Sequence, residues 1–315
     1  MKPAIRGFLL LSLRTAAILV IAALALPGPV SAQTSVSGVV SASTTWTAAG
    51  SPYIVTGDVY VQGVGAPVLT IQPGVTVKFN ANATLYIGYN PSGGLQAVGT
   101  AAQPILFTAN TATPTPGYWR GIWLWTYAAA TSQIAYATVS YGGVSNNNGG
   151  ININGSSPTV SNVTVQNNIH SGITVTGGAA AISNVTSTGN QWGMVMLGTT
   201  TASVSGSSLT ANTVGGVYLA APASPSLSAM SITNNTGWAM TQDGAVTLGT
   251  VTGLTATGNT NNAIEIRASS PGANTTWKNV GLPFAVTGDV YVQGAATPVL
   301  TIQPGVTVKF NANAT

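Results

Sequence analysis

The sequence contains no cysteine and very little charge. Only 4% of its 315 residues are charged, whereas an ordinary soluble domain is about 25% charged. Without cysteine, disulfides, thiolate nucleophiles and cysteine-ligated metal sites are excluded. Four acids and one histidine are the whole supply of groups for acid–base chemistry near neutral pH. Because 45% of the residues are apolar, the chain is nevertheless unlike a disordered protein and has enough material for a large core.

The positive charge is concentrated at the start of the chain. Lys2, Arg6 and Arg14 precede an unbroken 11-residue apolar run, Ala16–Leu26, and small residues follow up to Ala32. This order is typical of a secretory signal peptide, and the apolar run is too short to cross a bilayer. We therefore expect cleavage near Ala32 and a mature protein that is secreted or attached to the cell surface, without a transmembrane segment.

Removal of the leader leaves five of the eight cations against four acids, a net charge of +1. Nucleic acid binding needs a dense basic surface, so nucleic acid is not an expected partner. A metal site needs three or four convergent ligands, and His170 has no second histidine or acid near it in the sequence. We expect His170 to be an ordinary turn or surface residue, and we expect neither a metal nor a cofactor.

The chain contains a long internal repeat. Thr44–Thr84 recurs as Thr275–Thr315 at a constant offset of 231 residues, with 32 of 41 positions identical. The first copy continues into Leu85-Tyr86-Ile87, while the second ends at Thr315. We therefore predict a signal peptide over residues 1–32, an N-terminal linker over 33–43, one repeat unit over 44–274, and the start of a second, truncated unit over 275–315.

A shorter period of about 22 residues lies inside the unit. A small residue followed by an apolar–any–apolar triplet begins at Gly150, Gly172, Gly193, Gly216, Gly237 and Ala263. Five asparagines stand shortly before such triplets: Asn168, Asn190, Asn212, Asn234 and Asn259. Short β-type runs separated by Gly, Asn and Ser indicate strands and turns, and no helical periodicity is sustained after the leader.

Units of this length bury their apolar positions only by stacking on one another. Each strand then pairs with the equivalent strand of the next coil, about 4.8 Å away, with alternate side chains facing the core. Asparagine suits an inward ladder because its amide both donates and accepts hydrogen bonds. The sequence predicts an all-β parallel solenoid of about ten coils of 22–23 residues.

These triplets and asparagines resemble the repeats of right-handed parallel β-helix proteins of the pectin-lyase-like superfamily, in particular bacterial secreted members. The resemblance covers roughly residues 44–278. It implies the β-helix fold but leaves the function open, because that fold carries lyases, hydrolases, adhesins and inert scaffolds. Enzymes of the superfamily use clustered aspartates, or an acidic calcium site with a basic proton abstractor.

The four acids do not form such a cluster in the sequence pattern. Asp58 and Asp289 occupy the same repeat position, where an aspartate commonly bonds to turn amides. Counting from the triplets places Asp243 and Glu265 roughly 13 Å apart along the strand direction, beyond the roughly 5–9.5 Å of paired glycosidase carboxylates. No catalytic residue is predicted, and Glu265 with Arg267 is expected to form a surface ion pair.

An aromatic segment, Tyr118–Trp125, offers a different kind of site. Its alignment with the triplets directs Trp123 and Trp125 outward on one face, about 7 Å apart. Exposed indoles can stack on sugar rings, unless the insertion at residues 128–148 folds back and covers them. The candidate ligand-binding residues are Trp123, Trp125, Tyr218, Glu265 and Arg267.

The same alignment predicts one outward column across the coils: Trp123, Asn152, Thr174, Val195, Tyr218, Ala239 and Glu265. A regular threonine column would suggest ice binding, and this mixed column does not favour it. We expect a non-catalytic extracellular scaffold or adhesin that contacts polysaccharide or a cell-surface glycan. The alternative is a polysaccharide lyase or glycoside hydrolase of the same superfamily. An uncapped last coil would also favour end-to-end self-association.

Overall fold

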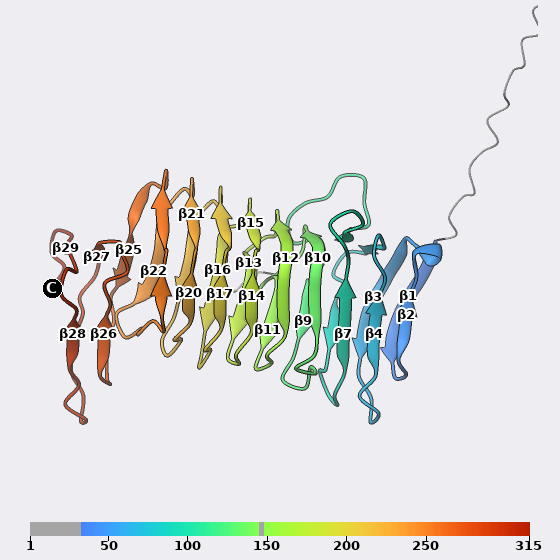
Figure 1. Ribbon diagram of the computed structural model, residues 1–315, viewed down its shortest axis with the longest axis horizontal. Coiled ribbons are helices and arrows are strands. Elements are labelled where there is room, and N and C mark those ends of the chain that lie inside the picture. The colour runs from blue at the N-terminus through green and yellow to red at the C-terminus, as the bar shows by residue number, and fades with distance from the viewer. Residues whose placement is uncertain (1–32, 145–147) are drawn as a thin grey trace, which may run out of the picture. The chain divides into compact units, whose positions relative to one another are not determined.

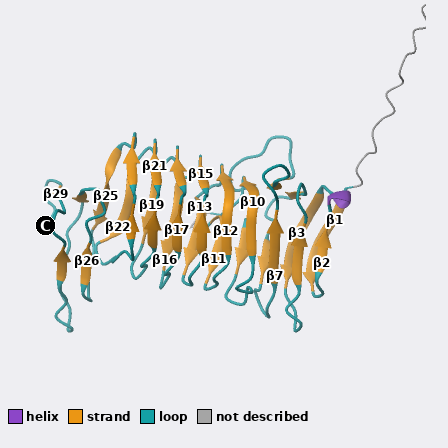
Figure 2. Cartoon of the chain, in the orientation of Figure 1, coloured by secondary structure: helices purple, strands orange, loops and turns teal. Residues whose placement is uncertain are grey.

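The computed structural model describes residues 33–144 and 148–315. The compact unit Ser31–Thr315 consists of short strands joined by turns, together with one turn of 3-10 helix, η1 (Ala48–Gly50) (Figure 1, Figure 2). Among the described residues, no helix has the length and apolar character needed to span a membrane. The predicted signal peptide, residues 1–32, lies outside the described residues.

The strands form a parallel solenoid of about eleven turns, as the short period predicts. Successive coils lie side by side in Figure 1, and their strands pair in three stacks. Long strands take part in two stacks, with a bend between the halves. This is visible at Asn162 in β12 (Thr159–Gln166), whose φ of 54° turns the chain.

Stack 1 contains β2 (Thr44–Trp46), β4 (Val68–Ile71), β7 (Gly94–Val98), the first half of β10 (Gln133–Ser140), the first half of β12, β14 (Ala181–Ser183), β17 (Ser203–Ser205), β20 (Ser226–Ser228) and β23 (Val251–Thr252). Stack 2 contains the first halves of β1 (Thr34–Val40) and β3 (Tyr53–Val61), then β5 (Thr76–Phe79), β8 (Ile105–Ala109), the second halves of β10 and β12, β15 (Thr186–Thr188), β18 (Ser208–Thr210), β21 (Ser231–Thr233) and β24 (Thr255–Thr257).

Stack 3 begins with the second halves of β1 and β3 and continues through β6 (Leu85–Ile87), β9 (Ile122–Leu124), β11 (Gly149–Asn154), β13 (Ser171–Thr176), β16 (Trp192–Leu197), β19 (Gly215–Leu219), β22 (Trp238–Asp243), β25 (Asn261–Arg267), β27 (Phe284–Val286) and β29 (Val308–Phe310). A separate pair is formed by β26 (Thr275–Trp277) and β28 (Leu300–Ile302).

The core runs along the inside of the coils. Alternate residues of the strands are buried, as in β4, where Leu69 and Ile71 are inside while Val68 and Thr70 are half-buried. Large rings fill the wider coils, and Phe79 stacks on Trp119 with 3.8 Å between ring centroids. Because every coil supplies inward apolar side chains, one continuous hydrophobic cluster extends through the described solenoid.

A buried asparagine ladder lies in the turn between stacks 2 and 3. Side-chain amides bond from each coil to the next over distances of 2.8–3.2 Å, from Asn168 through Asn190, Asn212 and Asn235 to Asn259. The prediction of Asn234 as a member is wrong, since Asn234 is exposed and Asn235 occupies the ladder position. The residue before each ladder asparagine adopts positive φ, and in this coil that residue is Asn234, at 56°.

The two copies of the long repeat each begin on a preceding strand, but in different stacks, because residues 53–55 lie in stack 2 and the equivalent residues 284–286 lie in stack 3. In the first copy β3 pairs with β1, matching Val36 with Val55, and in the second β27 pairs with β25, matching Ile266 with Val286. The expected linker over residues 33–43 is therefore wrong in part, because β1 within it supplies the strand on which the first copy stacks. Its residues Thr34-Ser-Val give the alternation of a half-buried strand.

Candidate functional site

Stack 3 carries the sequence-predicted site residues on its outward face. The observed column follows the predicted one through Trp123, Asn152, Thr174, Val195 and Tyr218, but then passes through Thr241 to Glu265. The prediction of Ala239 in this column is wrong, since Thr241 pairs in register with both Tyr218 and Glu265. Gly215 pairs with Trp238 and Val217 with Met240 without a register shift, so the strand triplet of this coil is Met240-Thr-Gln, and counting from Gly237 places the column two residues too early. Asn152, Thr174, Val195 and Thr241, the middle members of the column, are buried.

An aromatic cluster covers the first coils of this face. Tyr60, Tyr86 and Trp123 are direct neighbours on β3, β6 and β9. The rings of Tyr60 and Tyr86 stack at 4.8 Å between centroids, and those of Trp123 and Trp125 stack at 5.5 Å. Tyr89 joins the cluster edge-on to Trp125 at 5.3 Å. We call Tyr60, Tyr86, Tyr89, Trp123 and Trp125 the aromatic cluster.

The aromatic cluster is accessible in part. Tyr89 is 49% exposed, and the other four side chains are half-buried against one another. Residues 133–140 of the expected cover do not fold back over the cluster, because they form β10, which pairs with β7, β8 and β12 in the wall of the solenoid. Burial, aided by the nearby Asp58 carboxylate, raises the pKa of Tyr60.

Sequence reasoning missed the three tyrosines of this cluster, although a signal was present. Val59-Tyr-Val, Leu85-Tyr-Ile and Ile122-Trp-Leu are the same apolar–aromatic–apolar triplet on consecutive coils. Each places its ring in the outward middle position, and the parallel register then aligns the rings.

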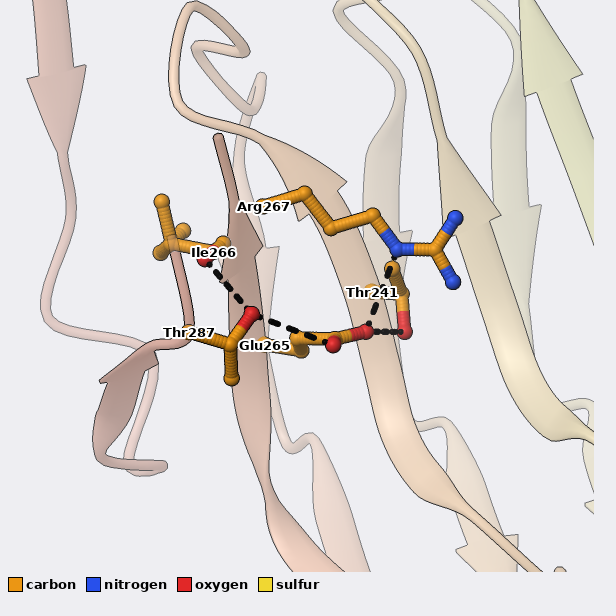
Figure 3. Close-up of polar contacts among 5 residues, drawn as sticks. All are labelled: Thr241, Glu265, Ile266, Arg267 and Thr287. Atoms are coloured by element: carbon orange, nitrogen blue, oxygen red, sulfur yellow. Dashed lines mark hydrogen bonds and ion pairs between the residues drawn. The ribbon is translucent and has the colours of Figure 1, made fainter. Parts of the chain in front are cut away.

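A second, charged cluster lies at the other end of the same face, and Figure 3 shows its polar contacts. Glu265 and Arg267 form the expected ion pair, with 3.3 Å between Oε2 and Nε. Two further donors hold the carboxylate, because Thr241 donates to Oε2 at 2.9 Å and Thr287 to Oε1 at 3.2 Å (Figure 3). The guanidinium carbon of Arg267 lies 5.3 Å from the centroid of the Tyr218 ring. The structure thus brings Tyr218, Thr241 and Thr287, which are distant in sequence, to the Glu265–Arg267 ion pair.

Asp243 belongs to this charged cluster. Its Cα pairs in register with that of Arg267, and that of Thr241 pairs with Glu265, so Asp243 and Glu265 are diagonal neighbours on adjacent strands. Their Cα atoms are separated by about 8 Å on standard strand spacings. The predicted separation of 13 Å is wrong, because the triplet of this coil starts later than Gly237. Burial raises the pKa of Tyr218, the Asp243 charge raises it further, and Arg267 opposes the rise.

Of the remaining titratable candidates, His170 and Asp289 stand apart from both clusters, whereas Asp58 contacts the aromatic cluster through Tyr60. His170 is half-buried, and burial lowers its pKa. Asp289 accepts hydrogen bonds from Tyr291 and Thr315, which lower its pKa, and Asp58 accepts the equivalent tyrosine bond from Tyr60. Within residues 33–144 and 148–315, no three His, Asp or Glu side chains are grouped as metal ligands would be.

Two family models match consecutive parts of the chain, a pectate-lyase-like β-helix domain over residues 38–152 and a right-handed β-helix region over residues 149–289. No curated protein matches the chain. Among solved structures, the periplasmic alginate epimerase AlgG aligns with 84% of this chain and 71% of its own, at 11% identity and a TM-score of 0.26, a likeness that carries no information about activity. The parallel coils and the two matches agree, and the chain belongs to the pectate-lyase-like right-handed parallel β-helix proteins.

Proposed function

We propose that this chain is a non-catalytic extracellular β-helix, a surface scaffold or adhesin, that binds polysaccharide through the aromatic cluster. The observation that carries the proposal is the continuity of five rings across three coils of one outward face. Partly exposed aromatic surface of this extent is unfavourable in water unless a partner covers it. Sugar rings have apolar C–H faces that stack on aromatic rings, whereas their hydroxyls stay in solvent.

Two further features support glycan binding: the low net charge of the chain, which suits a neutral or weakly charged polymer, and the fixed position of one indole. The mature chain has almost no net charge, so it neither attracts nor repels a polymer strongly. Arg120, the cation next to the cluster in sequence, is exposed, and its backbone carbonyl accepts the Trp123 indole N–H at 2.9 Å. This bond fixes one indole before any ligand arrives, which reduces the entropy lost on binding.

The repeat supplies a matched test of this proposal. Tyr60 and Tyr291 are equivalent residues, and each hydroxyl donates to its own aspartate. Tyr60 lies in the aromatic cluster, whereas Tyr291 is 52% exposed outside it. Stacking of a planar nucleobase on an aromatic side chain is worth about 1–3 kcal/mol by alanine substitution, and a stacked sugar ring is expected to contribute a similar amount. We therefore expect Tyr60→Ala and Trp123→Ala to weaken binding roughly ten- to hundredfold, and Tyr291→Ala to leave it unchanged.

Affinity electrophoresis and calorimetry against pectin, polygalacturonate, alginate, xylan and bacterial capsular polysaccharides measure these affinities. Circular dichroism of each variant controls for folding. The proposal is contradicted if Tyr60→Ala and Tyr291→Ala weaken binding equally. It is also contradicted if the unmodified chain binds none of these glycans.

A second candidate function, polysaccharide cleavage, is favoured by the diagonal placement of Asp243 and Glu265. Their Cα atoms are about 8 Å apart on standard strand spacings, a placement on one face from which two carboxyl groups can reach the separations of about 5–9.5 Å found in glycosidases. Against it, Glu265 already accepts three hydrogen bonds from protein donors. Catalysis would be established if the unmodified chain cleaved one of these polymers and if Asp243→Asn and Glu265→Gln each abolished the cleavage. That result would replace the scaffold proposal.

A further inference from the structure

The outward face of stack 2 carries two parallel columns of hydroxyl side chains. Over five successive coils, β12, β15, β18, β21 and β24, nine of ten outward positions are Ser or Thr. We call these ten residues the hydroxyl array. One column is Thr164, Thr186, Ser208, Ser231 and Thr255, and the other is Gln166, Thr188, Thr210, Thr233 and Thr257.

The hydroxyl array is regular in two directions. All four pairings that build it are parallel and without register shifts. Its hydroxyls therefore repeat about every 4.7–4.9 Å from coil to coil and about every 6.6 Å along each strand. Thr233 donates to Thr210 at 3.1 Å, a direct contact between neighbouring coils. All ten side chains are half-buried or exposed, so the hydroxyls reach the surface.

The interior holds this face in place. Val165, Leu209 and Ile232, the inward neighbours of array residues, are fully buried in the core. Threonine is stiff at χ1 because it is β-branched, so few rotamers are left to freeze when a partner binds. The bend between stacks 1 and 2 is preceded by further outward hydroxyls in the same coils: Ser161, Ser183, Ser205, Ser228 and Thr252.

Four of the five array coils carry no Asp, Glu, Lys or Arg, because none of these residues occurs between Arg120 and Asp243 in the sequence. Strongly hydrated side chains would otherwise interrupt an ordered water layer on this face. The aromatic rings expected at a sugar-binding site are also absent from the ten positions.

We propose that the hydroxyl array binds ice, a function separate from glycan binding on stack 3. A single surface hydroxyl gains little from a partner, because liquid water offers it equivalent hydrogen bonds. Ice differs from other hydroxyl-rich partners in presenting water oxygens on a fixed two-dimensional lattice. A rigid face with its own two-dimensional repeat can bind many of those oxygens at once. Because folding has already ordered its side chains, the face loses little conformational entropy on binding. The mixed column of stack 3 lacks this repeat.

Adsorption of the whole secreted chain to ice tests the proposal. Slow growth of an ice surface in a dilute solution measures how much protein enters the ice, and osmometry measures the gap between melting and freezing points. The unmodified chain should be enriched in ice and should open this gap. Thr188→Lys and Thr210→Lys, made separately, should each reduce both readouts to the level of a protein that does not bind ice.

Thr70→Lys is the matched control, because Thr70 is a half-buried outward threonine of stack 1 in an early coil. It should leave both ice readouts unchanged, and circular dichroism should show all three variants folded. Exclusion of the unmodified chain from ice overturns the proposal. Equal losses in the array variants and the control also overturn it, as does array-dependent binding to crystalline chitin or cellulose without enrichment in ice.

Discussion

Neighbouring residues of one type have opposite roles in the turn before β22. Asn235 is buried and makes four side-chain hydrogen bonds, accepting from the backbone and side-chain amides of Asn212 and donating to Leu209 and Asn259. Asn234 is exposed and bends the chain with positive φ, a conformation that asparagine tolerates better than most residues. Position relative to the coil axis, and not residue type, decides which amide joins the ladder.

Substitution of these two asparagines should separate their roles. Asn235→Ala leaves buried donors and acceptors of the adjacent coils without partners, at about 1–3 kcal/mol for each such group. We expect a loss of several degrees in melting temperature. Asn234→Gly keeps the positive φ without strain and should leave the melting temperature nearly unchanged. Thermal unfolding of both variants measures the difference, and similar losses in the two would contradict the ladder assignment.

His170 should make stability depend on mildly acidic pH. Its half-buried imidazole has a lowered pKa in the folded chain, because burial disfavours the charged form. The unfolded chain takes up a proton near the usual pKa of about 6.5, before the folded chain does. Unfolding is therefore favoured as the pH falls from that value to the lower folded pKa. Melting temperatures from pH 8 to 5 should decline less for His170→Gln than for the unmodified chain, and parallel curves would contradict this origin.

At the scale of elements, close approach between strands sets the geometry of stack 3. Trp192 at the start of β16 packs over Gly215 on β19, and its ring also lies 5.5 Å from that of Tyr218. The glycine leaves the space that the indole fills. Strand β16 is buried on both faces, as β11 and β13 are, and Trp192 itself is only 7% exposed.

A side chain at Gly215 should disrupt this packing. A Cβ there would overlap the Trp192 ring and lie 3.0 Å from the Trp238 carbonyl oxygen. Overpacking of a tight site typically costs about 1–3 kcal/mol. Gly215→Ala should lower the denaturation midpoint by a matching amount, whereas Gly65→Ala, with nothing within 4 Å of its Cβ, should not lower it. Denaturant unfolding compares them, and an unaffected Gly215→Ala would show that the indole moves aside freely.

At the scale of the whole molecule, equivalent residues of the two repeat copies differ in burial. Phe79 is fully buried, while its counterpart Phe310 is 59% exposed, and Ile71 and Ile302 are 1% and 47% exposed. In the first copy, β8 pairs with β5 and β7 pairs with β4, whereas β29 and β28 each pair with one strand only within the described residues. Unpaired backbone groups beside apolar side chains form a template for another chain.

We therefore expect this 315-residue chain to self-associate at micromolar concentrations. Light scattering coupled to size-exclusion chromatography measures the mass as a function of concentration. Phe310→Lys combined with Ile302→Lys should restore a monomer, and Val64→Lys, which changes a fully exposed residue near the first coils, should not. A monodisperse monomer of the unmodified chain at those concentrations would contradict the expectation.

The sequence by itself determines the period, the strand triplets and therefore the stacked parallel coils, because a unit of about 22 residues buries its apolar side chains only against its neighbours. It also indicates Trp123 and Trp125 as outward rings and Glu265 with Arg267 as an ion pair. These inferences depend on side chains close together in the chain, where strand alternation alone fixes their direction.

The tertiary structure decides how residues of different coils are aligned. Coil lengths vary, so spacing in sequence does not give register, and a slip of one residue moves a side chain to the other face. For this reason the sequence pattern predicts Asn234 and Ala239 where the structure has Asn235 and Thr241, and it places Asp243 too far from Glu265. The alignment of Tyr60 with Tyr86 and Trp123 likewise depends on the pairing of β3, β6 and β9. The hydroxyl array exists only when five coils stack in register, because its two columns of side chains run from coil to coil and not along a single strand.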